Sequence, residues 1–170
     1  PHPYHESITN WQRDFQLTIG KNHAKYFDKN GWLFFTREIF DLFYPSYGDT
    51  YPVYNGAIGM TYEQGGGGAG GLGVETDEKD TLTLVDRIAH HYATSLSTLE
   101  VASANAGALV KEFHKFFDNA QSGSVGDYKT YVVKYKESDA QRISALRLLL
   151  DKNGIQYGSG SGSSKGYNFH

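Results

Sequence analysis

The chain has 170 residues and a formal net charge of −3, with 16 Lys and Arg against 19 Asp and Glu. This length suits one domain or part of a larger one, and the charge argues against a nucleic-acid partner. The absence of cysteine excludes disulfides, thiolate metal sites and cysteine nucleophiles. No stretch approaches the roughly 20 apolar residues of a membrane helix, so we expect no membrane span in these residues.

The first predicted element is a helix. Apolar and ring residues recur at three- and four-residue steps between positions 8 and 27, which predicts a helix that closes near Gly31. Thr36 is placed to cap a second, short helix that Pro45 would end. Positions 44–54 hold two prolines and four tyrosines and are predicted to form a turn-rich loop.

Positions 55–63 are predicted to form a buried strand. Ile58, Met60 and Tyr62 alternate with small or polar residues, and the other face ends in Glu63. The small residues around this carboxylate would let a ligand approach closely. A glycine-rich run and an acidic stretch follow.

The rest of the chain divides at a predicted linker over 121–127. Before it, an apolar stripe over 82–117 predicts one long helix, or two helices broken near Gly107. After it, we expect a strand over 128–135, a helix over 139–152 and a short strand over 155–157. The predicted domains are therefore 1–120 and 128–170, and the predicted fold class is α/β.

The phrases around the predicted strand resemble one known family. Tyr44-Pro45-Ser46-Tyr47-Gly48-Asp49, the run from Tyr54 to Met60, and Thr61-Tyr62-Glu63 followed by Gln64-Gly65-Gly66 are similar to the zinc carboxypeptidases, which are carboxypeptidase A-like metallopeptidases. The resemblance covers roughly residues 9 to 118 and is closest to large, multidomain bacterial members. It implies that residues 1–120 are the C-terminal part of a mixed-sheet α/β/α catalytic domain, and that a second α/β unit begins after the linker.

The resemblance also implies an activity and a site. The intact protein would hydrolyse peptide bonds at a C-terminus, with Glu63 as the catalytic general base and acid. Tyr44 and Tyr47 compete for the position of the family's substrate-capping tyrosine, and Thr61, beside Glu63 on the same strand, is a further substrate-binding candidate. Secretion or export to the periplasm is expected from the resemblance alone.

The metal-binding part of the family pattern is missing. No His in this chain has Glu three residues after it, and the family's Asn-Arg substrate-binding pair is also missing. In the family, these residues precede the catalytic strand. We therefore expect this chain to be a fragment, with the zinc held by upstream residues of the same polypeptide, and we expect the fragment alone to be inactive.

Other sequence features support competing functions less well. His2 and His5 have a spacing that a metal could use, whereas His90 and His91 diverge on a helix. The run from Gly66 to Gly71 has a dinucleotide-binding spacing, but no helix follows it directly. The rival class is a non-catalytic extracellular module that binds a glycan or a peptide on the tyrosine-rich loop.

Overall fold

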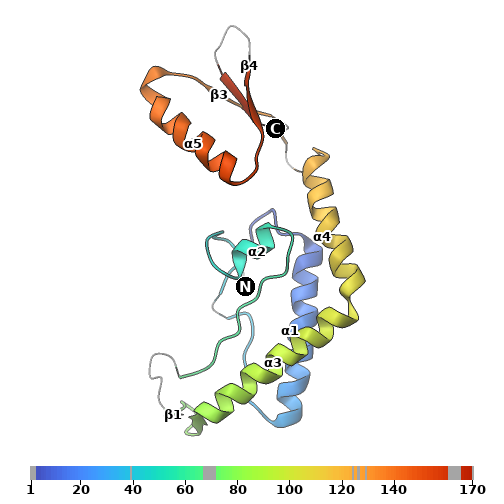
Figure 1. The fold of residues 1–170 in the computed structure, drawn as a ribbon. Coiled ribbons are helices and arrows are strands. Elements are labelled where there is room, and N and C mark those ends of the chain that lie inside the picture. The colour runs from blue at the N-terminus through green and yellow to red at the C-terminus, as the bar shows by residue number, and fades with distance from the viewer. Residues whose placement is uncertain are drawn as a thin grey trace. The chain divides into compact units, whose positions relative to one another are not determined.

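The computed structural model describes residues 3–38, 40–66, 72–123, 125, 127–128 and 130–160, and the backbone of 166–169. Over these residues the chain combines helices with short strands, so it is α/β in the coarse sense of the term (Figure 1). It divides into two compact units, Pro1–Asp118 and Asn119–His170, and each is described by itself below.

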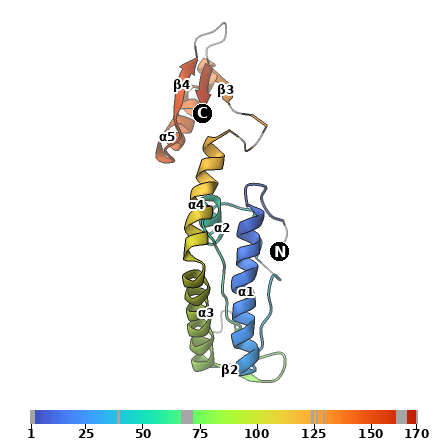
Figure 2. The same cartoon turned by 90° about the vertical axis from the view of Figure 1, so that its right-hand side faces the viewer.

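The first unit is built on two antiparallel helices, α1 (Asn10–Asn30) and α3 (Leu84–Ala104), which lie side by side (Figure 2). A capping box between Thr9 and Gln12 begins α1, because each side chain satisfies a backbone N–H that the first turn leaves free. Gly31 ends the helix with φ 67°, a left-handed conformation that glycine adopts without strain. The predicted first helix and its end at Gly31 are confirmed.

A small hairpin leads into α3. Strands β1 (Gly73–Glu75) and β2 (Thr81–Thr83) pair antiparallel, and a second capping box, between Thr83 and Asp86, begins the helix. Helix α3 ends at Asn105, and α4 (Ala106–Gln121) follows at once. Of the two alternatives, the pair of helices is correct, and the break at Asn105 lies near Gly107, as predicted.

The core of the first unit consists of two clusters. Ile8, Leu42 and Val53 form the first, beside the short helix α2 (Thr50–Tyr54). The second lies between α1 and α3, where half-buried Trp11, Ile58, Met60 and Leu109 surround three buried residues, namely Phe15, Ile19 and Val101. Both clusters are small, so much of the apolar surface of this unit is exposed.

Two predictions for the region between α1 and β1 are wrong. The described residues of 36–43 are not helical, because Arg37 has φ 66°, which a right-handed helix cannot contain. Residues 55–63 are not part of a sheet, because no described strand lies beside them to form a ladder. The loop predicted over 44–54 is interrupted by α2, whose Pro52 lies in the first turn, where its missing N–H costs nothing.

The second unit is a three-stranded sheet with one helix. Strands β3 (Tyr131–Lys134), β4 (Tyr157–Gly160) and β5 (Gly166–Phe169) lie in the order β3-β5-β4, and both pairings are antiparallel. Between β3 and β4 the chain forms the 3-10 turn η2 (Glu137–Asp139) and helix α5 (Ala140–Lys152), whose buried residue is Ile143. The predicted strand, helix and strand are present in that order, but the last strand begins at Tyr157 instead of Ile155.

Among the helices of the described ranges, none combines the length and the apolar character that crossing a bilayer requires.

Candidate functional site

The site is built around Glu63, in the segment that runs from Ala57 to Gln64 across α1 and α3. Ile58 and Met60 pack on the cluster between the two helices. From Met60 to Gln64, half-buried side chains alternate with the exposed side chains of Thr61 and Glu63. The predicted alternation is therefore present over residues 60–64, whereas Gly59, predicted for the same face as Glu63, is buried, and the segment is not hydrogen-bonded as a strand.

Tyr62 anchors the segment immediately before Glu63. Its hydroxyl lies 2.9 Å from Thr98 Oγ1 on α3, and its ring meets the His23 ring of α1 edge-on, with the ring centres 4.8 Å apart. Burial raises the pKa of the Tyr62 phenol above its ordinary value, although the hydrogen bond with Thr98 acts in the opposite direction. The phenol is therefore neutral near pH 7 and serves as an anchor that contacts both helices.

Gln64 anchors the other side of Glu63. Its Oε1 lies 3.0 Å from His90 Nδ1, and because an amide oxygen only accepts, the His90 proton is on Nδ1. The buried His90 ring packs against Trp32 and Phe27, with centroids 4.5 and 5.3 Å away. Burial lowers the pKa of His90, which keeps the imidazole neutral near pH 7.

Thr61 connects the segment to the loop before α2. Its hydroxyl donates to Asp49 Oδ2 over 2.6 Å, and Thr50 Oγ1 donates to the other oxygen of the same carboxylate over 3.2 Å. Gly59 lies so close to the Asp49 carbonyl that a Cβ at this position would overlap it. Thr61 is thus placed beside Glu63, with its hydroxyl engaged within the protein.

Glu63 itself is exposed and makes no hydrogen bond or ion pair within the described part of the chain. Its neighbours at 61, 62 and 64 are each held by a side-chain contact. The carboxylate therefore extends from a fixed backbone and is free to accept a proton or a hydrogen bond from a bound molecule.

Tyr44 and Tyr47 lie together on the loop before α2. Their rings are 58% and 60% exposed and meet edge-on with centroids 5.7 Å apart. The loop is secured nearby, where Tyr54 Oη donates to the Phe43 carbonyl over 2.6 Å. In the described residues no contact joins either ring to Glu63, so the structure does not distinguish between the two candidates for the capping tyrosine.

In the ranges that the structure describes, no three His, Asp or Glu side chains form a group that could hold a metal ion. His23 is engaged by Ser97, His90 by Gln64, and the His5 ring packs against Tyr54. His2 and positions 67–71 of the glycine-rich run lie outside the described residues. The side chains of the described residues therefore form no group that could hold zinc.

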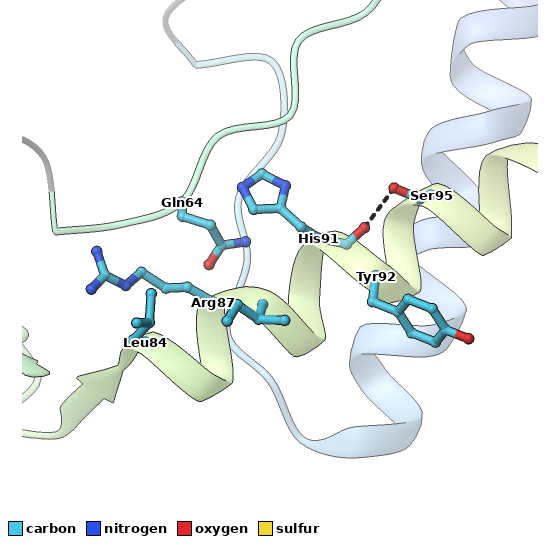
Figure 3. A pocket seen from close by; sticks show the side chains of 7 residues that line it. Gln64, Leu84, Arg87, His91, Tyr92 and Ser95 are labelled. Carbon is cyan, nitrogen blue, oxygen red and sulfur yellow. Dashed lines mark hydrogen bonds between the residues drawn. The ribbon is translucent and has the colours of Figure 1, made fainter. Parts of the chain in front are cut away.

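Sequence reasoning missed an open groove beside Gln64, with a volume of about 500 Å³ (Figure 3). Gln64 reaches into it from the overlying segment, and the other lining residues come from α3, namely Leu84, Arg87, Ile88, His91, Tyr92 and Ser95. The predicted divergence of His90 and His91 is confirmed, because His90 is buried whereas His91 lines this groove. Several large apolar residues of the predicted stripe thus line a groove instead of a core.

Comparison with known proteins finds no matching family model, no matching curated protein and no matching solved structure.

Proposed function

We propose that this chain is the part of a zinc carboxypeptidase-like metallopeptidase that carries the catalytic glutamate, Glu63. In this proposal, residues 1–120 are the C-terminal portion of an α/β/α catalytic domain, and residues 128–170 begin a second α/β unit. The substrate is a peptide or protein that is cut at its C-terminus, and secretion or export to the periplasm is part of the same proposal.

The observation that carries the proposal is that Glu63 is exposed while the residues on either side of it are held in place. A general base has to be accessible to its substrate and fixed in position. Glu63 is exposed, while Tyr62 and Gln64 on either side are tied to Thr98 and His90 of α3. The arrangement is the one expected of a base that acts on a molecule bound above the segment.

The reaction requires one group to accept and then return a proton. The Glu63 carboxylate would take a proton from the attacking water and then deliver it to the nitrogen of the departing amino acid. Thr61 would help to position Glu63 indirectly. Its hydroxyl donates to Asp49, and this contact fixes the backbone of the segment that carries Glu63. Tyr44 or Tyr47 would cover the substrate from the neighbouring loop, where both rings are exposed.

The zinc ion of this proposal is held outside the described residues. Since the histidines near Glu63 are packed or hydrogen-bonded within the fold, its ligands would come from the upstream part of a longer polypeptide. The chain alone is then expected to have neither stoichiometric zinc nor peptidase activity.

One observation favours the rival function, which is non-catalytic binding of a glycan or peptide. Tyr44, Tyr47 and Tyr51 are each more than half exposed on one short stretch, and exposed aromatic rings stack well on sugars and peptides. In this alternative, Glu63 has no metal partner, and the coding sequence upstream lacks a His-x-x-Glu pair with a later His.

The test is release of C-terminal amino acids from a mixed peptide set by the longer polypeptide, followed by mass spectrometry. We expect single-residue shortening that a chelator stops and added zinc restores, and no shortening by the 170-residue chain alone. Tight binding of the peptides without shortening would overturn the proposal and favour the binding module.

A further inference from the structure

We propose that helix α3 pairs with α3 of a second copy of this chain, antiparallel and about a two-fold axis, through an exposed apolar stripe. This α3 stripe consists of five side chains, namely Val85, Ile88, Tyr92, Leu96 and Leu99. The inference goes beyond the proposed function and does not depend on it, because Glu63 lies outside the stripe.

The first observation is that the α3 stripe is exposed although it is apolar. Its five side chains remain 48–73% exposed. The buried row of α3, which includes Ser97 and Val101, meets α1. At about 100° per residue, the stripe is centred on the opposite side of the helix. Among the described residues of the first unit, Figure 2 shows α1 along one side of α3 and no helix along the other.

The second observation is the order of the side chains, which has the same spacing in both directions from Tyr92. Val85 and Leu99 are each seven residues from it, and Ile88 and Leu96 are each four. In a two-fold interface, residue i contacts residue j of the partner and j contacts i. An antiparallel pair centred on Tyr92 therefore matches every apolar side chain of the stripe with another one. The opposed helix dipoles favour the same direction.

The third observation is the shape of this side of the helix. Successive members of the stripe are three, four, four and three residues apart, an average of 3.5, which is the period of the seam between paired helices. The groove of about 500 Å³ runs beside the stripe and shares Ile88 and Tyr92 with it, and in Figure 3 Tyr92 points away from Gln64. A row of side chains with a groove beside it is the surface that packs against a second helix.

The fourth observation is that no charged residue of α3 lies in the stripe. Asp86 caps the start of the helix, Arg87 lines the groove beside Gln64, and Glu100 accepts hydrogen bonds from α1. Pairing two copies along the stripe therefore buries no unpaired charge and sets no like charges against each other.

The area of the stripe sets the expected affinity. Five side chains of these sizes and exposures present on the order of 600 Å² per copy, or about 1,200 Å² for two copies. This is the lower end of the range for specific interfaces, roughly 1,200–2,000 Å². We therefore expect a dissociation constant in the micromolar range, on the order of 10 µM.

Sedimentation equilibrium of the 170-residue chain tests the pairing. We expect a reversible monomer–dimer equilibrium between about 1 and about 200 µM. A monomer at the highest concentration would overturn the inference. Neither zinc nor peptidase activity enters this readout, so the inference and the proposed function can fail separately.

A pair of charged variants tests the surface. Ile88→Glu with Leu96→Glu changes two exposed side chains, so the helical content measured by circular dichroism should stay the same. The four facing carboxylates should weaken the dimer on the order of 100-fold or more. The control Val110→Glu, at an exposed position of α4, should leave the dissociation constant unchanged. An unchanged dimer of the Ile88→Glu, Leu96→Glu variant would refute the stripe as the interface.

Single cysteines test the direction, because the chain has none of its own. In the antiparallel pair, position 85 faces position 99 of the partner, whereas the two copies of position 85 lie about 21 Å apart, too far for a disulfide. A mixture of Val85→Cys and Leu99→Cys chains should therefore oxidise mainly to the mixed disulfide. Rapid formation of the Val85→Cys homodimer would overturn the antiparallel pairing.

Discussion

Replacing Gln12 by Leu should destabilise the first unit more than any surface change, because this buried side chain joins three parts of it. Its Oε1 accepts from the backbone N–H of Thr9 over 2.9 Å, which completes the N-terminal cap of α1. Its Nε2 donates to the carbonyls of Val53 and Ala57, both over 2.9 Å. The amide thus connects α1 to α2 and to the start of the segment that carries Glu63.

The magnitude follows from those contacts. Leu is close to Gln in volume, so little cavity forms. The variant nevertheless loses three hydrogen bonds between the Gln12 side chain and backbone groups. At about 1 kcal/mol each, with partly buried backbone groups left unpaired, the loss is about 3 kcal/mol. Natural domains have about 5–15 kcal/mol of stability in total, so this loss is easily measured.

Tryptophan fluorescence during urea unfolding is the assay. Both tryptophans, Trp11 and Trp32, lie in the first unit, so the signal reports on that unit alone. The matched control is Gln141→Leu, at an exposed position of α5 in the second unit, with no expected effect on this signal. A loss below about 1 kcal/mol for Gln12→Leu would refute the reasoning, since a buried amide with these partners cannot be removed so cheaply.

Three further predictions follow from the same region. Gly59→Ala should lower the midpoint of unfolding, because the added methyl group overlaps a backbone carbonyl, while Gly107→Ala, in open space on α4, should raise it by up to about 1 kcal/mol. Thr98→Val should lower the free energy of unfolding of the first unit by about 1 kcal/mol, because the half-buried Tyr62 hydroxyl loses its partner, and an unchanged value in urea titrations would show that this hydroxyl needs no partner. Burial lowers the pKa of His23 below 6.5, so the unfolded chain binds more protons than the fold, and stability declines as pH falls through 6.5 and further. In urea titrations across this range His23→Gln should show a smaller decline, and an equal decline would exclude His23 as a cause.

The sequence predicted the helices well because their signals are local. The end of α1 follows from Gly31, which is readable within a few residues of the helix, whereas its Thr9 cap was identified only in the structure. The break between α3 and α4 lies at Asn105, close to the glycine that predicted it, Gly107. The false helix after Thr36 shows the limit of such signals, because a suitable cap does not exclude the positive φ of Arg37.

The predicted strand over 55–63 failed for a different reason. Its alternation is present over residues 60–64, but a ladder needs a second backbone, and no residue within the segment can supply one. The sequence also could not predict that Thr98 and His90 hold Tyr62 and Gln64, the neighbours of Glu63. Thr98 and His90 lie far from Glu63 along the chain and have no distinctive local pattern. Glu63, Thr61 and the two candidate tyrosines, Tyr44 and Tyr47, could be chosen in advance only through the resemblance, and they stay predictions.

The central claim is that Glu63 is the proton-transferring group of a peptidase, and the turnover number of Glu63→Gln in the longer polypeptide tests it most directly. The matched control is Glu78→Gln, at another exposed glutamate of the first unit. We predict that Glu63→Gln lowers kcat on the order of 100-fold or more while zinc content by elemental mass spectrometry stays the same, and that the control leaves kcat unchanged. A kcat for Glu63→Gln equal to that of the unaltered enzyme would contradict the claim.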